Sequence, residues 1–102
     1  MEKLLLLKHT EGQTAIALYF KNEDQVRNWW TDLPCPEKFI LIYEGERKKS
    51  GHRFKLTYSK FDERGQLYSK YIICFSKKEA IFLEKKIKEI NPNYITNIKK
   101  IY

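Results

Sequence analysis

The same succession of strand-like and helix-like sequence patterns occurs twice in this chain, and it limits the possible folds more than any other feature. In the first half, residues 4–9 and 14–20 are rich in apolar side chains, as is typical of strands. The turn Glu11-Gly12-Gln13 lies between them and predicts a hairpin. A helical pattern follows, and residues 39–43 then predict a third strand. The predicted order is therefore strand, strand, helix, strand.

The second half repeats this order. Apolar and polar side chains alternate over residues 54–59, which predicts a strand with one solvated face. The polar residues 62–66 predict a turn, and residues 67–75 predict the return strand. A helical pattern follows again, and residues 94–102 predict the last strand. The segment 44–53 between the halves has no apolar periodicity, so we expect an exposed connection there.

Both predicted helices carry start and stop signals. Asn22 and Ser76 are favourable N-cap residues, and Gln25 and Glu79 follow them by three positions, which completes a capping box in each case. Proline follows each helix and ends it. The second helix has an apolar stripe at helical spacing, formed by Ala80, Leu83, Ile87 and Ile90.

The repeated order predicts the fold class. Both hairpin turns contain Gly-Gln, and both second strands end in phenylalanine, at Phe20 and Phe75. These matches indicate pseudo-repeat units over residues 1–46 and 53–102, arising either from duplication of a ββαβ unit or from chance recurrence of a common α+β pattern. Because each helix can bury only one stripe, we expect a single α+β domain over residues 1–102. Its antiparallel or mixed sheet would have about six strands, with both helices on one face.

The positive charge is concentrated in the second half. The 102 residues include 20 Lys and Arg against 13 Asp and Glu, a net charge of +7, and the two signs balance up to Gly51. A basic surface favours anionic partners, because cations contact phosphates and an aromatic ring can stack on a base. We therefore predict nucleic-acid binding, and the alternative is that the same lysines only protect a solvated sheet edge. The predicted contacts are Arg47, Lys48, Lys49, Arg53, Lys55, Lys60, Tyr68 and Lys70.

One stretch of the second half resembles a known family. The turn Asp62-Glu63-Arg64-Gly65-Gln66 and the helix start Phe75-Ser76-Lys77-Lys78-Glu79-Ala80 lie within residues 54–86, about a third of the chain. This stretch is similar to the amino-terminal arm-binding domains of phage-type tyrosine integrases, and the resemblance implies a three-stranded sheet that enters a DNA groove. The preceding aromatic strand and the following catalytic domain of that family are missing from this sequence.

Few residues suit catalysis. His9 and His52 have no partner at metal-ligand spacing, and Cys35 and Cys74 are expected to be reduced thiols. Glu44 and Glu46 fall on one face of an extended segment, as carboxylates that bind a divalent ion do, but the adjacent Arg47 and Lys48 offer salt bridges instead. The glycines are isolated and form no phosphate-binding loop. We therefore expect no enzymatic activity, no metal and no cofactor.

Two adjacent tryptophans give a second hypothesis. Trp29 and Trp30 lie about 100° apart on a helix, so they cannot both face one core line. Either both pack at the edge of the helix–sheet interface, or one anchors a protein partner. The alternative function is thus a protein-binding accessory or inhibitor, such as a phage anti-defence protein that blocks a host nucleic-acid enzyme. The last strand, which ends at Tyr102, would form part of that interface or pair with a second copy in a homodimer.

The apolar segments are short. The longest aliphatic run, residues 4–7, is shorter than the roughly 20 residues of a membrane span and than the roughly 7 of a signal-peptide core. We expect a cytoplasmic protein without membrane association. The abundance of Lys, Ile and Tyr fits a phage or mobile-element product, and it also fits an AT-rich genome.

Overall fold

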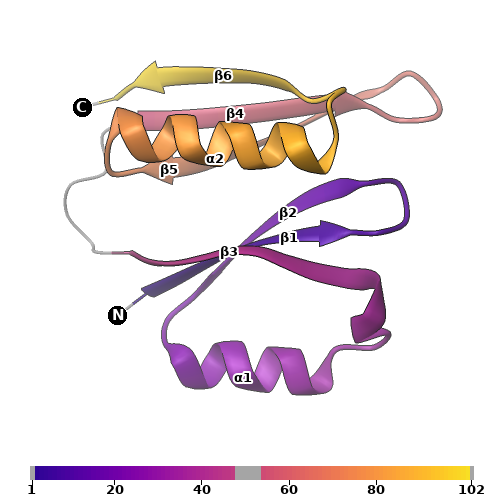
Figure 1. Cartoon of the computed structure of the whole chain (residues 1–102), viewed down its shortest axis with the longest axis vertical. Coiled ribbons are helices and arrows are strands. Elements are labelled where there is room, and N and C mark those ends of the chain that lie inside the picture. The colour runs from indigo at the N-terminus through magenta and orange to yellow at the C-terminus, as the bar shows by residue number, and fades with distance from the viewer. Residues whose placement is uncertain (1, 48–53, 102) are drawn as a thin grey trace. The chain divides into compact units, whose positions relative to one another are not determined.

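In the part of the chain that the structure describes, each half folds into three strands and one α-helix. The computed structural model describes residues 2–47 and 54–101, and the chain divides into two units, Met1–Lys49 and Ser50–Tyr102 (Figure 1). In unit 1 the elements are β1 (Glu2–His9), β2 (Thr14–Phe20), α1 (Glu23–Asp32), a 3₁₀ helix η1 (Pro36–Lys38) and β3 (Phe39–Arg47). In unit 2 they are β4 (Phe54–Phe61), β5 (Leu67–Cys74), α2 (Lys77–Ile90) and β6 (Ile95–Lys100).

The two sheets have the same topology. Their strand orders are β2-β1-β3 and β5-β4-β6, so the first strand of each unit is central and antiparallel to both neighbours. The two outer strands of each sheet therefore run parallel to each other, and a parallel connection needs a crossover, which the helix supplies. This shared topology confirms the repeated ββαβ order that the sequence predicts.

The α+β class, the six strands and the two helices are confirmed, but the strands form two sheets and not the single sheet that we expected. β1 and β4 each pair along both edges with strands of their own unit, and no pairing joins the units among the described residues. Pairing within a unit closes shorter loops than pairing between units, and so loses less chain entropy. Without a common sheet, the two helices share no sheet face.

The strand β3 is longer than predicted and continues through part of the expected connection. Glu44 and Glu46 belong to β3 and pair with Leu5 and Lys3 of β1. The prediction of a connection from residue 44 onward was wrong because the charged segment gains its partners from β1, which is distant in sequence. Residues 48–53, the rest of that segment, lie outside the described part of the chain.

Both predicted capping boxes are present. The Asn22 side chain accepts a hydrogen bond from the Gln25 amide at 3.0 Å, and the Ser76 hydroxyl accepts one from the Glu79 amide at 3.1 Å. The carboxylate of Glu79 in turn accepts from the Phe75 amide. These bonds satisfy amide groups that have no partner inside the helix, so each helix begins where the sequence predicts.

The two helices differ in how they pack. Ala80, Leu83, Ile87 and Ile90 of α2 are buried, as the predicted stripe requires. The helix α2 lies along the unit 2 sheet (Figure 1). The buried Leu56 and Ile72 belong to the sheet face that it covers. In contrast, α1 has no fully buried residue, and its Trp29 packs against Phe20 and Phe39 with ring centroids 5.7 and 6.4 Å apart.

No helix in the described part of the chain has both the length and the apolar character that a membrane crossing requires.

Candidate nucleic-acid interface

The predicted contact residues fall partly outside the described structure. Lys48, Lys49 and Arg53 lie outside the described residues, as does Tyr102 of the predicted protein interface. Arg47 is the last residue of β3 in unit 1. The other four predicted nucleic-acid contacts, Lys55, Lys60, Tyr68 and Lys70, all belong to β4 and β5 of unit 2.

The register of the β4–β5 hairpin divides these four residues between two faces of the sheet. Lys60 pairs with Tyr68, and Lys70 pairs with Tyr58. Directly paired residues point to the same face, and side chains alternate along a strand. Tyr58 is buried, so this is the face that α2 covers. Lys55 has the opposite parity and points to the other face.

We call this second face the open face. It is defined by residues of odd number on three neighbouring strands, because β4 pairs in register with both β5 and β6. Its members are Lys55, Thr57, Ser59 and Phe61 of β4, Leu67, Ser69, Tyr71 and Ile73 of β5, and Ile95, Asn97 and Lys99 of β6. The open face therefore joins one predicted contact, Lys55, to residues that the sequence analysis did not single out.

The three strands of unit 2 are strongly basic. Together they carry five lysines and no aspartate or glutamate. The carboxylates of unit 2 belong to the hairpin turn and to α2. Among the described residues, neither Lys55 nor Lys99 of the open face forms an ion pair. Their charges are consequently not neutralised by the protein.

The sheet of unit 1 has a different charge pattern. The Lys3 ammonium lies 3.2 Å from a carboxylate oxygen of Glu23, 3.5 Å from one of Glu46 and 3.9 Å from one of Glu44. The hydrogen bond to Glu23 and the attraction of these carboxylates raise the pKa of Lys3. Glu44 and Glu46 thus both form salt bridges with Lys3, a partner that the sequence analysis had not identified.

A cation and an aromatic ring meet at one end of the open face. The Lys55 ammonium lies 4.6 Å from the centroid of the Tyr71 ring, which is within the range of a cation–π interaction. Lys99 is directly opposite Lys55 on β6, and Ile73 is opposite it on β5. Tyr71 is 57% exposed. This end therefore presents two positive charges beside an accessible aromatic side chain.

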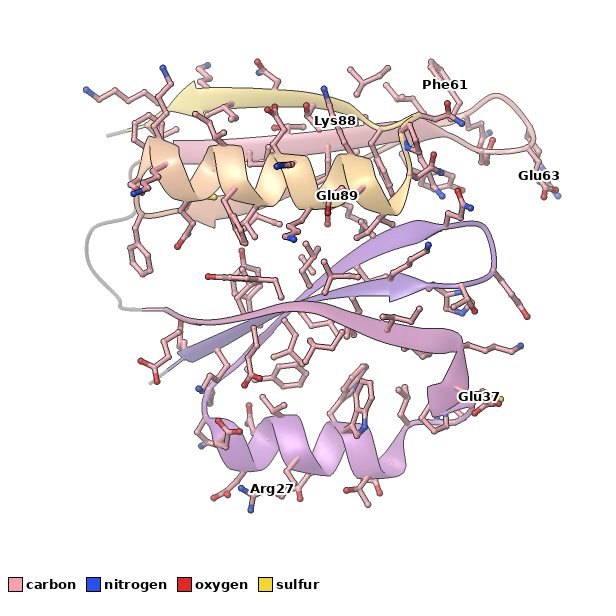
Figure 2. The ribbon with its side chains drawn as sticks, in the orientation of Figure 1. Arg27, Glu37, Phe61, Glu63, Lys88 and Glu89 are labelled. Atoms are coloured by element: carbon pink, nitrogen blue, oxygen red, sulfur yellow. The ribbon has the colours of Figure 1, made fainter. Side chains whose placement is uncertain are left out.

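The other end of the open face is apolar. Phe61 and Leu67 form the last pair of the hairpin, and Ile95 is opposite Ser59, the next open-face position along β4. Phe61 is 60% exposed, and Leu67 and Ile95 are also more than half exposed. Figure 2 shows Phe61 at the end of β4, near the hairpin turn that carries Glu63. Between the two ends, the hydroxyls of Ser59 and Ser69 are hydrogen-bonded to each other at 2.7 Å.

The predicted contacts on the helix-covered face have different surroundings. The Lys60 ammonium lies 5.5 Å from the centroid of the Tyr94 ring, and that ring packs edge-to-face on Tyr58. Burial disfavours the charged ammonium and lowers the pKa of Lys60. Tyr68 and Lys70 are exposed, but the register separates them from Lys55. Lys55 and Tyr68, both predicted contacts, therefore lie on opposite faces, and the aromatic ring beside Lys55 is that of Tyr71.

The residues considered for chemistry were the two histidines, the two cysteines and the pair Glu44 and Glu46. No group of three or more His, Cys, Asp or Glu side chains that could hold a metal ion is found within residues 2–47 and 54–101. The His9 ring is hydrogen-bonded to the Glu11 carbonyl, and His52 lies outside the described residues. Of the two cysteines, Cys35 is exposed and Cys74 is buried.

The two tryptophans have different environments. Trp29 lies between Phe20 and Phe39, as expected for a side chain at the helix–sheet interface. Trp30 is 39% exposed and contacts the Trp29 ring at a centroid distance of 5.7 Å. Of the two, Trp30 is the residue more accessible to a protein partner.

The fold and the candidate interface define an α+β protein with two ββαβ units and a basic, partly aromatic sheet face in the second unit. Comparison with protein-family models, with curated proteins and with solved structures finds no match to this chain. Its function must therefore be argued from its own residues.

Proposed function

We propose that the open face of unit 2 binds nucleic acid, with Lys55 and Lys99 contacting phosphates and Tyr71 contacting a base or sugar. The observation that carries the proposal is that the open face bears Lys55 and Lys99 and that its three strands contain no carboxylate on either face. Nucleic acids present a regular row of negative charges, so a sheet without carboxylates avoids repulsion along the bound strand. The proposal assigns binding to this face and no chemical step.

The position of the exposed aromatic side chain supports the same conclusion. A basic surface that only keeps a protein in solution needs no ring among its cations. Here Tyr71 lies within the lysine-bearing end of the face, 4.6 Å from the Lys55 ammonium. Proteins that bind nucleic acid commonly combine backbone-contacting cations with rings that stack on bases.

The proposal is tested by fluorescence anisotropy with labelled oligonucleotides, single-stranded and duplex, at salt concentrations between about 50 and 200 mM. The test variant is Lys55→Ala combined with Lys99→Ala. The matched control is Lys85→Ala combined with Lys88→Ala, which removes the same charge from exposed positions on α2. If both open-face lysines contact phosphates, the slope of log K against log salt should decrease by about 1.4 for single strands or 1.8 for duplex.

The control variant should change the slope much less. An equal change in both variants would show that only net charge matters, and would overturn the assignment to the open face. Absence of binding by the unmodified protein at the lowest salt concentration would overturn the function itself. The search would then turn to a protein partner, beginning with the exposed Trp30.

A further inference from the structure

We infer that the open face binds single-stranded rather than duplex nucleic acid, with one base stacked on Tyr71 and another on Phe61. This inference rests on the proposed function and specifies the class of ligand. It is drawn from the uneven distribution of charged and apolar side chains along the face.

The first argument is the separation of cations and apolar groups. The face has Lys55 and Lys99 at one end and Phe61, Leu67 and Ile95 at the other. A duplex covers its bases by pairing and presents phosphates along its whole length, so phosphates would lie against the apolar end. A single strand can place its phosphates near the lysines and turn unpaired bases toward the rings.

The second argument is the exposure of Phe61. A phenylalanine has no polar group that would favour contact with water, and this one is 60% exposed beside two other exposed apolar side chains. Exposed apolar side chains that adjoin one another, rather than lie scattered over the surface, are a feature of binding sites. The surrounding strands carry lysines and no carboxylates, so the charge of the face is complementary to an anionic ligand that also offers flat apolar surfaces. A nucleobase on a phosphate backbone meets both requirements.

The third argument is the spacing of the two rings. Tyr71 pairs with Thr57, and Phe61 is four residues further along β4 on the same face. Four residues of a strand span about 13 Å, so the rings are separate platforms rather than one stacked pair. The hydrogen-bonded hydroxyls of Ser59 and Ser69 lie between them. A strand that crosses the face from the lysines to Phe61 would therefore pass Tyr71 first and the two hydroxyls next.

The experiment compares Tyr71→Leu and Phe61→Leu, which keep apolar bulk but remove the ring, with the control Tyr68→Leu. Tyr68 belongs to the same strand as Tyr71 and is equally accessible, at 55% against 57% exposed, but it points to the opposite face. Affinities are measured by anisotropy at about 50 mM salt with labelled oligothymidylate, oligouridylate and a mixed-sequence duplex. Thermal unfolding by circular dichroism confirms that each variant is folded.

The expected result is that the single strands bind at least tenfold more tightly than the duplex. Loss of one stacked base by ring removal typically weakens binding roughly 5- to 140-fold. Tyr71→Leu and Phe61→Leu should each fall in this range with an unchanged salt slope, whereas Tyr68→Leu should bind like the unmodified protein.

Four outcomes would overturn the inference. Duplex binding as tight as single-strand binding, with no effect of Tyr71→Leu, would refute the single-strand assignment and leave the proposed function intact. An equal loss of affinity in Tyr68→Leu would show that base stacking is not confined to the open face. A change of oligomeric state in Phe61→Leu, measured by sedimentation, without a change in affinity per protomer would assign the apolar end to a second copy of the chain. Absence of binding to every probe would overturn the proposed function as well.

Discussion

The substitution Leu83→Ala tests the packing that makes the open face the exposed face of its sheet. Leu83 is completely buried in the stripe by which α2 covers the unit 2 sheet. If α2 did not pack there, both faces of the sheet would be available and the assignment of Lys55 and Tyr71 to the binding face would lose its basis. The effect of this substitution on stability therefore bears directly on the proposed function.

Its magnitude follows from burial. Replacing a fully buried leucine by alanine removes transfer free energy and leaves a cavity, and it destabilises proteins by 2–5 kcal/mol, so we expect about 3 kcal/mol here. For a domain of 60–100 residues, 1 kcal/mol lowers Tm by roughly 4–8 °C. The expected decrease in Tm for Leu83→Ala is therefore about 12–24 °C.

Ile81→Ala is the matched control, because it removes an aliphatic side chain of the same size from the same helix. Ile81 is 49% exposed, so about half of the 1.5–3 kcal/mol of a fully buried side chain is lost, or about 1 kcal/mol. The expected decrease in Tm is roughly 4–8 °C.

Both variants are measured by thermal and urea unfolding monitored by circular dichroism. The reasoning would be refuted if Ile81→Ala and Leu83→Ala destabilised the protein equally, or if Leu83→Ala cost less than about 1 kcal/mol. Either result would mean that the α2 stripe is not packed against the sheet. The urea m-value should be unchanged in both variants, since a changed m-value would indicate an altered denatured state and not a lost contact.

Two further predictions concern unit 1. The Lys38 ammonium donates a hydrogen bond to the Glu11 carboxylate at 2.8 Å, and this bond lowers the pKa of Glu11 in the folded protein. The ion pair therefore stabilises the fold fully above the unfolded-state pKa of Glu11, about 4.3. This stabilisation is lost as the pH falls through the lower pKa of the folded state. A titration followed by carbon-13 NMR should give a midpoint for the Glu11 carboxyl below its ordinary pKa of about 4.3. Lys38→Met should return that midpoint to the ordinary value. A midpoint that Lys38→Met leaves unchanged would show that Lys38 does not cause the shift. Trp29→Ala should destabilise the protein by about 2–3 kcal/mol, because Trp29 contacts the rings of Phe20, Trp30 and Phe39, and Trp30→Ala, which loses one of these contacts, by about 1 kcal/mol. Urea unfolding measures both, and equal values would show that the Trp29 contacts contribute nothing.

The elements of this fold could be predicted because their signals are local. Capping boxes at Asn22 and Ser76 position the helices through bonds that span three or four residues, and strand alternation is visible within residues 54–59. These features depend on near neighbours, so the sequence alone contains them.

The number of sheets and the extent of β3 could not be predicted in the same way. Glu44 and Glu46 look like part of a polar connection until β1 supplies backbone partners and the Lys3 ammonium. That pairing brings together residues about 40 positions apart, and no pattern within either segment specifies it. Likewise, the expectation of one sheet depended on pairing between the halves, for which local patterns carry no information.

The turn between β4 and β5 explains why the sequence analysis identified only part of the candidate site. The last hairpin pair, Phe61 and Leu67, encloses five residues, and an odd number between paired positions places residues of the same parity on the same face. Asp62 closes this turn by accepting hydrogen bonds from the amides of Arg64 and Gln66, and Gly65 provides the positive φ of +79° that the turn requires.

With one residue fewer or more in this turn, the β5 side chains that share a sheet face with Lys55 would be the other set. Lys55 would then share a face with Tyr68 and Lys70, which the sequence analysis names with it as nucleic-acid contacts, and Tyr71 would point to the other side. The sequence holds the turn signals at Asp62 and Gly65, but it does not state which pair closes the hairpin. The identity of the aromatic ring beside Lys55 is thus decided by hairpin register, and the expected difference in affinity between Tyr71→Leu and Tyr68→Leu follows from that register.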